Sequence, residues 1–234
     1  MAGGAKARRL PRAVRERQMM DAAVRCFARH GYQAASMDEI AELAGVSKPL
    51  VYLYLNSKEE LFTAVIRREA QALLAVVAEA VADRSAPPVE RRDRSTPTDE
   101  RRDRSAPPDE RLWAGLLAFF TYAAEHPDSW AVLSRQARTQ GEPFAGEAAR
   151  MRDEITAFVA GLIGEAAREA RGGADITGRD VAALAQALVG SAESLASWAN
   201  ETPGATAKEA AATLMNFAWS GLGNLMKSER WSPR

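Results

Sequence analysis

The residues best suited to chemistry in this sequence are cationic and phenolic side chains grouped between positions 48 and 58. Lys48, Tyr52 and Tyr54 follow one another within two turns of a short helical segment, and Lys58 comes at the start of the next one. Phenol and ammonium groups donate hydrogen bonds to phosphate oxygens, and the free amides at a helix N-terminus already favour an anion. This grouping predicts a surface that binds phosphate groups.

Other kinds of reactive site find little support in the sequence. One cysteine, Cys26, and two histidines exclude a disulfide framework and leave too few ligands for the usual zinc sites. Acids and bases are not clustered as in catalytic motifs, so we expect no catalytic residue, no metal, no cofactor and no enzyme activity. No apolar run approaches the roughly 18 residues of a membrane span, and the basic N-terminus lacks the apolar stretch of a secretory signal. We therefore expect a cytoplasmic protein that associates with the nucleoid and not with a membrane.

The distribution of charge points to an anionic partner for the N-terminal part of the chain. Lysine plus arginine and aspartate plus glutamate each number 31 in 234 residues, so the formal net charge is zero. The first 58 residues hold ten basic and five acidic residues, a net charge of +5, and the remaining 176 residues carry −5. This asymmetry is typical of a polyanion-binding module joined to a second domain. A flexible basic tail on a neutral domain is the alternative.

Helical periodicity dominates the chain and predicts an all-α fold of about nine helices. Ser36 with Glu39, and Ser57 with Glu60, have the spacing of a capping box that starts a helix. The second of these opens a helix of about 25 residues, roughly 37 Å long. The expected helices are 13–29, 37–44, 48–55, 58–82, 112–125, 129–139, 144–171, 180–200 and 205–227.

A ten-residue repeat interrupts this helical pattern after residue 83. Residues 84–93 read RSAPPVERRD, 94–103 read RSTPTDERRD, and 104–111 read RSAPPDER. The repeat carries only Val89 as a large apolar side chain, so it cannot bury enough surface to offset the entropy of ordering. We expect a disordered insert at 84–111. The alternative is that its arginine clusters bind phosphates, although neighbouring acids neutralise them.

The segment 36–55 has the pattern of a helix-turn-helix motif. Two short helices flank the break Gly45-Val46-Ser47, and apolar side chains such as Ile40 and Val51 would hold them at an angle. In such a motif the N-terminal part of the second helix enters the major groove of DNA. Asp38 is open to two interpretations: it could accept a hydrogen bond from a cytosine amino group, or it could stabilise a helix N-terminus.

Residues 13–66 resemble the N-terminal domain of TetR-family (tetracycline-repressor-type) transcriptional regulators. The resemblance rests on the run I-A-x-x-A-G-V-S-K-P-x-V-Y-x-Y-x-x-S-K-E-E-L-F from Ile40 to Phe62. It implies a basic flexible arm at 1–12, a DNA-binding domain at 13–58, and a ligand-binding and dimerisation domain at 59–234 that contains the insert. Met37 stands where many members have a small hydroxyl residue, which removes an expected phosphate contact. By matching position, the resemblance implies DNA contacts from Ser36, Met37, Ser47, Lys48, Pro49, Leu50, Tyr52, Leu53, Tyr54 and Lys58.

The same resemblance implies that the second domain encloses an apolar pocket and forms a homodimer. Helices 180–200 and 205–227 are the expected dimer interface, because their alanine, glycine and serine residues permit close approach. An aromatic lining favours a small hydrophobic effector. The candidate pocket residues are Trp113, Phe119, Phe120, Tyr122, Trp130, Phe158 and Trp198.

Together these features predict a dimeric repressor that binds a palindromic operator in double-stranded DNA and is released by a small hydrophobic effector. A ligand-independent architectural or co-regulator protein, which would use the motif only for docking on DNA, is the alternative. An all-α enzyme is a third class, and it would need the catalytic cluster that the sequence lacks.

Overall fold

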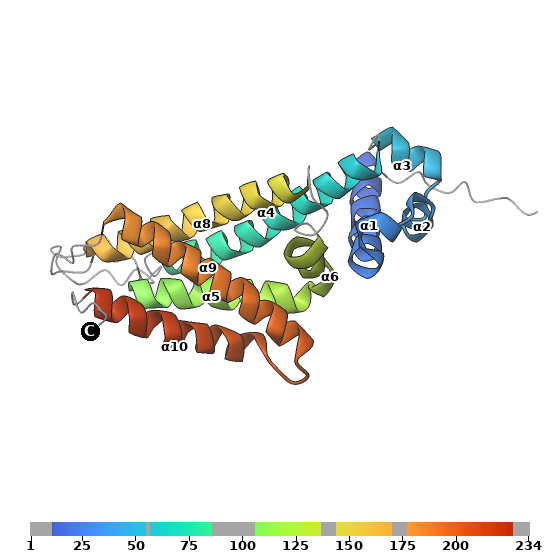
Figure 1. Cartoon of the computed structure of the whole chain (residues 1–234). Coiled ribbons are helices and arrows are strands. Elements are labelled where there is room, and N and C mark those ends of the chain that lie inside the picture. The colour runs from blue at the N-terminus through green and yellow to red at the C-terminus, as the bar shows by residue number, and fades with distance from the viewer. Residues whose placement is uncertain (1–10, 55–56, 86–105, 137–143, 170–176, 227–234) are drawn as a thin grey trace, which may run out of the picture. The chain divides into compact units, whose positions relative to one another are not determined.

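The structure of the chain, a computed structural model, describes residues 11–54, 57–85, 106–136, 144–169 and 177–226. These residues form nine α-helices and one π-helical segment and contain no β-strand, which confirms the all-α prediction (Figure 1). No helix among them has the length and apolar character needed to cross a membrane. The elements are α1 (Arg12–Ala34), α2 (Met37–Leu43), α3 (Lys48–Tyr54), α4 (Lys58–Ser85), α5 (Pro108–Glu125), α6 (Pro127–Ala131), η1 (Val132–Gln136), α8 (Phe144–Glu169), α9 (Gly178–Glu201) and α10 (Ala207–Met226).

The chain folds as two compact units, and each is built from two stretches of sequence. The first unit comprises Met1–Glu69 and Asp128–Ala148, and the second comprises Ala70–Pro127 and Ala149–Arg234. The first unit is therefore larger than the DNA-binding domain expected at 13–58. It also includes the first turns of α4, the segments α6 and η1, and the start of α8.

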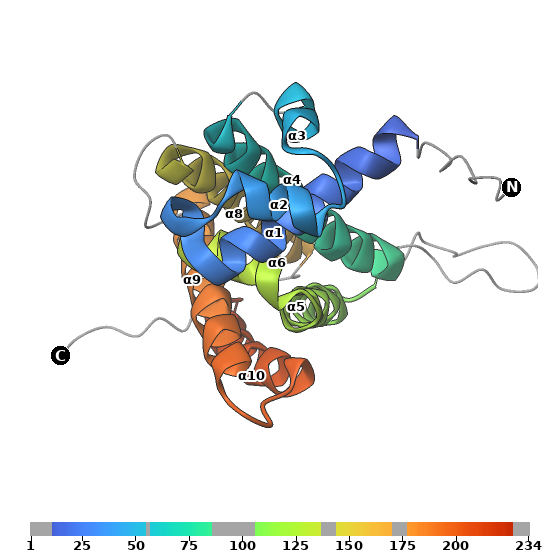
Figure 2. The same cartoon turned by 90° about the vertical axis from the view of Figure 1, so that its right-hand side faces the viewer.

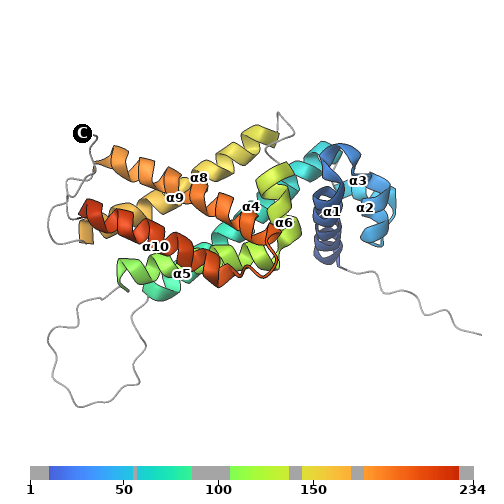
Figure 3. The same ribbon diagram turned by 60° about the horizontal axis from the view of Figure 1, so that its bottom comes forward.

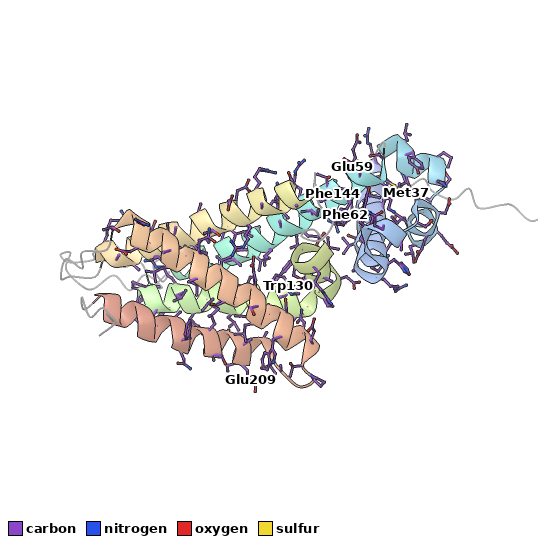
Figure 4. All side chains as sticks on the ribbon, viewed as in Figure 1. Met37, Glu59, Phe62, Trp130, Phe144 and Glu209 are labelled. Carbon is purple, nitrogen blue, oxygen red and sulfur yellow. The ribbon has the colours of Figure 1, made fainter. Side chains whose placement is uncertain are left out.

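An aromatic cluster forms the centre of the first unit. The ring of Phe62 on α4 lies 4.8 Å from the ring of Phe27 on α1 and 4.8 Å from the ring of Phe144 on α8. Tyr32 completes the cluster, with its ring centroid 4.6 Å from that of Phe144. Figure 4 labels Phe62 and Phe144 within this cluster. Packing of this kind fixes the start of α4 against α1, because close-packed rings leave little room for movement.

The segment after α5 differs from the helix expected at 129–139. It is a five-residue α-helix, α6, followed by the π-helical segment η1, and η1 packs on α1. Trp130 and Val132 are buried, and the Ser134 hydroxyl donates a hydrogen bond to the Trp130 carbonyl at 2.7 Å. Residues 137–139 lie outside the described part of the chain.

The second unit is a helical bundle in which α5, α9 and α10 pack against one another (Figure 3). A capping box starts α9, because the Thr177 hydroxyl accepts from the Asp180 amide and the Asp180 carboxylate accepts from the Thr177 amide. Gly115 lets α5 approach α4 closely: a Cβ atom at this position would lie 3.1 Å from Cγ2 of Val81.

The structure corrects the boundaries expected for the insert at 84–111. Helix α4 continues to Ser85 and α5 begins at Pro108, so residues 84–85 and 108–111 of the expected insert are helical. Residues 86–105 lie outside the part of the chain that the structure describes. Arg111, counted with the repeat, is 7% exposed. Its guanidinium donates to the Glu165 carboxylate at 3.4 Å and to the Glu169 carboxylate at 3.1 Å, which ties α5 to α8.

Candidate nucleic-acid interface

Ser36 caps the N-terminus of α2, although not through the capping box that the sequence suggested. The Ser36 hydroxyl accepts from the Asp38 amide at 3.2 Å. The Glu39 carboxylate does not return to the cap. Its Oε1 lies 3.0 Å from Nε2 of His30, and its Oε2 accepts from the Cys26 thiol at 3.5 Å. Glu39 therefore links α2 to α1, and the expected reciprocal cap at this site is wrong. At the start of α4 the Ser57 hydroxyl does accept from the Glu60 amide, at 3.0 Å.

The turn between α2 and α3 has the hydrogen bonds of a Schellman motif. The Gly45 amide donates to the Glu42 carbonyl, and the Val46 amide donates to the Ala41 carbonyl, each at 3.0 Å. Gly45 has a φ of 65°, in the left-handed region that the motif requires and that glycine adopts without a steric cost. Helix α3 then packs on α2 (Figure 2). The side chain of Val51 is completely buried. The sequence predicted this helix-turn-helix to within one residue at the boundaries that the structure describes.

The outer face of α3 is the most exposed apolar and phenolic surface of the motif. Leu53 is 77% exposed and Tyr52 is 39% exposed. Ser47, Lys48 and Pro49 are exposed at the start of the helix. Ser36 is also exposed, and Leu50 is half-buried, whereas the side chain of Tyr54 and the whole of residues 55–56 lie outside the description. The exposed side chains of α3 are therefore open to a contact with a molecule outside the chain.

Met37 does not belong to this surface. Its side chain is only 6% exposed, and it is buried with Ile40 and Ala41 on the inner face of α2. The side chain of Met37 is therefore not available for the DNA contact implied for this residue, because it contributes to the core on the inner face of α2. Figure 4 labels its position in the first unit.

Two lysines that were expected to meet DNA already have partners in the fold. The Lys48 ammonium donates to the Asp38 carboxylate at 2.8 Å, and this hydrogen bond raises the pKa of Lys48. The Lys58 ammonium donates to the Gln33 carbonyl at 2.9 Å and lies 4.8 Å from the centre of the Tyr32 ring. Burial lowers the pKa of Lys58. Lys58 thus binds the end of α1, whereas Lys48 stays on the surface of α3.

Known proteins are similar to this chain over both units. The sequence profile of bacterial regulatory proteins of the tetR family matches residues 19–65, and that of a tetracyclin repressor-like C-terminal domain matches residues 108–221. The crystal structure of a TetR-like transcriptional regulator from Rhodococcus sp. RHA1 is 35% identical in sequence. The match covers 92% of this chain and 99% of that chain, with a TM-score of 0.68. The chain belongs to the tetR family.

Other tetR-type proteins match over less of the sequence or at lower identity. The transcriptional activator FasR of Mycolicibacterium smegmatis is 46% identical over 79 residues, which are 34% of this chain and 36% of FasR. The transcriptional repressor AcnR of Corynebacterium diphtheriae is 36% identical over 66 residues, 28% of this chain and 35% of AcnR. This chain therefore spans about a third of the length of these curated relatives. FadR of Bacillus subtilis, solved in complex with stearoyl-CoA, shares the fold at 18% identity, with 92% and 100% of the chains covered and a TM-score of 0.66.

Proteins of the tetR family are DNA-binding transcriptional regulators, and the second unit is the part of this chain in which the sequence predicted a ligand pocket. Six of the seven aromatic residues expected in a pocket belong to this unit, whereas Trp130 is buried in the first unit. Trp198 is 54% exposed, so it does not line an interior pocket of the single chain. The other five are Phe120 and Tyr122, which are buried, and Trp113, Phe119 and Phe158, which are half-buried.

Proposed function

We propose that this tetR-family regulator is a dimeric repressor that reads a palindromic operator with α3 and leaves it when a small hydrophobic effector binds. The exposed face of α3 is the observation that carries the DNA-binding part. Leu53 has 77% of its surface exposed, so its side chain contributes little burial energy to the free protein. In the major groove this side chain can contact a thymine methyl group. The proposed contacts are Ser36, Ser47, Lys48, Pro49, Leu50, Tyr52, Leu53 and Tyr54.

A selection experiment tests the recognition of DNA. The full chain is bound to a random double-stranded library, and the enriched sequences are determined. We expect a palindrome, because a two-fold dimer presents two α3 helices to half-sites separated by whole turns of DNA. Leu53→Ser should weaken binding to that sequence, and Asp153→Asn, at an exposed position of α8 in the second unit, should leave it unchanged. Equal binding of Leu53→Ser and the wild type would refute the assignment of α3.

Exposed aromatic residues on α9 and α10 support the dimer. Trp198 on α9 and Phe217 and Trp219 on α10 are exposed, and Phe217 is 73% exposed. Large exposed apolar groups on neighbouring helices mark an interaction surface. Sedimentation velocity should therefore give twice the mass of the chain for the wild type. Phe217→Ser should shift the protein towards the monomer, whereas Lys208→Ala on the same helix should not.

The effector is proposed from the second unit together with the ligand of one structural neighbour. Trp113, Phe119 and Phe158 are half-buried, so part of their surface remains open to an apolar ligand. FadR of Bacillus subtilis carries stearoyl-CoA in the same fold, which makes acyl thioesters the first class to test. Native mass spectrometry with acyl-CoA of increasing chain length, and with free CoA as the control, measures binding directly. A regulator whose operator affinity responds to none of these ligands would favour the ligand-independent alternative.

The relatives include both kinds of regulator, because FasR is named an activator and AcnR a repressor. Repression requires only that the operator be occupied, whereas activation also requires a contact with polymerase. A reporter gene placed downstream of the selected operator distinguishes the two. Lower expression in the presence of the regulator supports repression, and higher expression refutes it.

A further inference from the structure

A charge pair joins the two helices of the helix-turn-helix motif on its outer surface. The Lys48 ammonium at the start of α3 donates to Oδ2 of Asp38 in the first turn of α2, at 2.8 Å. The side chains of Lys48 and Asp38 are 46% and 68% exposed. Lys48 stands four residues before Tyr52 on α3, so these two side chains lie on the same face of the helix.

Stability of the fold does not account for this pair. Exposed ion pairs contribute little to folding, because water screens them and two long side chains lose freedom. The N-terminus of α2 is also served by other groups, since the Ser36 hydroxyl accepts from a free amide and Glu39 adds a second acid to the first turn. The contact is better explained by what the two groups can do together at the surface.

The pair presents a hydrogen-bond donor beside a hydrogen-bond acceptor. An ammonium that gives one N–H to Asp38 keeps two more to donate, and a carboxylate accepts several hydrogen bonds at once. In the major groove a G·C pair offers N7 and O6 of guanine as acceptors next to the N4 amino group of cytosine as a donor. Lysine favours the guanine atoms and aspartate the cytosine amino group, so Lys48 and Asp38 match the two halves of this edge.

We propose that Asp38 determines operator specificity together with Lys48. The pair reads one G·C base pair in each half-site, and the hydrogen bond to Asp38 prevents the Lys48 ammonium from binding a phosphate. The inference rests on the proposed function, in which α3 enters the major groove. It assigns Lys48 to a base edge rather than to the backbone, and it gives Asp38 a role that a helix-stabilising acid would not have.

Salt dependence separates these roles, because each phosphate contact steepens the slope of log affinity against log salt by about 0.9. A Lys48 that is held by Asp38 adds no such contact. Lys48→Met should therefore leave the slope unchanged while it lowers operator affinity. Asp38→Asn keeps the shape of the side chain but removes the charge that holds Lys48. The released ammonium should then bind a phosphate and steepen the slope on random DNA by about 0.9.

The experiment uses the full chain as wild type, Asp38→Asn, Lys48→Met and the double variant. Glu42→Gln is the matched control, because Glu42 is also an exposed acid on α2. Each protein is subjected to random-library selection and to salt titrations on the selected operator and on random DNA. We expect both single variants to lose preference at the same G·C pair by roughly 5- to 150-fold. The double variant should lose no more than either single variant, and Glu42→Gln should keep both the preference and the slope.

Three results would overturn the inference. They are an unchanged preference in Asp38→Asn, losses at different base pairs in the two single variants, and a slope that falls by about 0.9 in Lys48→Met. Thermal unfolding of each variant checks the fold, and Asp38→Ser, which also removes the charge, is the substitute if Asp38→Asn unfolds. If the wild type selects no sequence at all, the proposed function itself fails. A wild type that selects a palindrome without the shared G·C pair overturns only the present inference.

Discussion

Gly45 is the position at which one added methyl group should weaken the helix-turn-helix motif most selectively. Gly45 follows the C-terminus of α2 and has a φ of 65°. The amides of Gly45 and Val46 donate the two hydrogen bonds of the Schellman motif. Apart from Gly45 and its two chain neighbours, no atom of the described residues lies within 4 Å of a Cβ built at this position. Replacement by alanine therefore adds no collision, and its effect is set by the backbone alone.

The expected magnitude follows from two opposing terms. A left-handed backbone costs an L-residue about 1–2 kcal/mol. Alanine regains about 0.4–1 kcal/mol by restricting the unfolded chain. The difference between these two terms is a destabilisation of the first unit in Gly45→Ala by about 0–1.6 kcal/mol. Gly45→Asn should lose less, because asparagine tolerates this conformation. Gly161 is the matched control: it lies inside α8, and outside its chain neighbours and the backbone of its own helix no atom of the described residues lies within 4 Å of its Cβ position. Gly161→Ala should therefore stabilise the protein by about 0.5–1 kcal/mol.

Hydrogen exchange read by mass spectrometry measures these effects for each helix, and it avoids the assumption that the two units unfold together. Exchange in α2 and α3 should speed up in Gly45→Ala and stay unchanged in Gly161→Ala. Operator affinity should fall in Gly45→Ala, because the turn sets the angle at which α3 leaves α2. A Gly45→Ala protein as stable as Gly161→Ala would refute the left-handed turn and the account of the motif that depends on it.

Three further experiments test the contacts and the burial that the structure assigns. Lys58→Met removes the hydrogen bond to the Gln33 carbonyl and should cost about 1 kcal/mol in urea denaturation. The slope of log affinity for DNA against log salt should not change, and a slope that is smaller by about 0.9 would show that Lys58 contacts a phosphate. Burial raises the pKa of the Cys26 thiol above 9.0, so the folded state disfavours the thiolate. The contribution of Cys26 to stability is then complete below pH 9 and is lost as the pH rises above it, and thiol labelling at pH 8 should follow unfolding; rapid labelling of the folded protein would contradict this. Phe144→Ala removes a ring 4.8 Å from Phe62 and should destabilise the first unit by about 3–5 kcal/mol in the same denaturation assay, with Phe144→Leu losing less. Equal losses in the two variants would mean that the ring itself does not pack there.

The helix-turn-helix could be predicted from the sequence because its determinants are local. Apolar spacing places Ile40 and Val51 inside, and Gly45 ends one helix three residues before the next one begins. Contacts between residues far apart in the sequence could not be predicted in this way. Glu39 fits a capping box by spacing, but the side chains of α1 hold it, and Lys58 fits a phosphate site but binds a carbonyl 25 residues away.

The second unit shows the same limit for burial and for boundaries. An aromatic residue in a helix is easily assigned to a protein interior, but the sequence does not say which of the two units buries it. Trp130, which was expected in the pocket of the second domain, is buried in the first unit. Arg111 continues the arginine pattern of the repeat. Its partners Glu165 and Glu169 are more than 50 residues away, so its place in the second unit became clear only from the fold.

Methylation interference on the selected operator tests most directly whether α3 reads the major groove. Methylation of guanine at N7 alters the major groove, and methylation of adenine at N3 alters the minor groove. We expect N7 methylation to block binding at guanines in two symmetric half-sites, with centres about 34–36 Å or a multiple of that distance apart. Interference confined to adenine N3, or none at either position, would contradict recognition through α3.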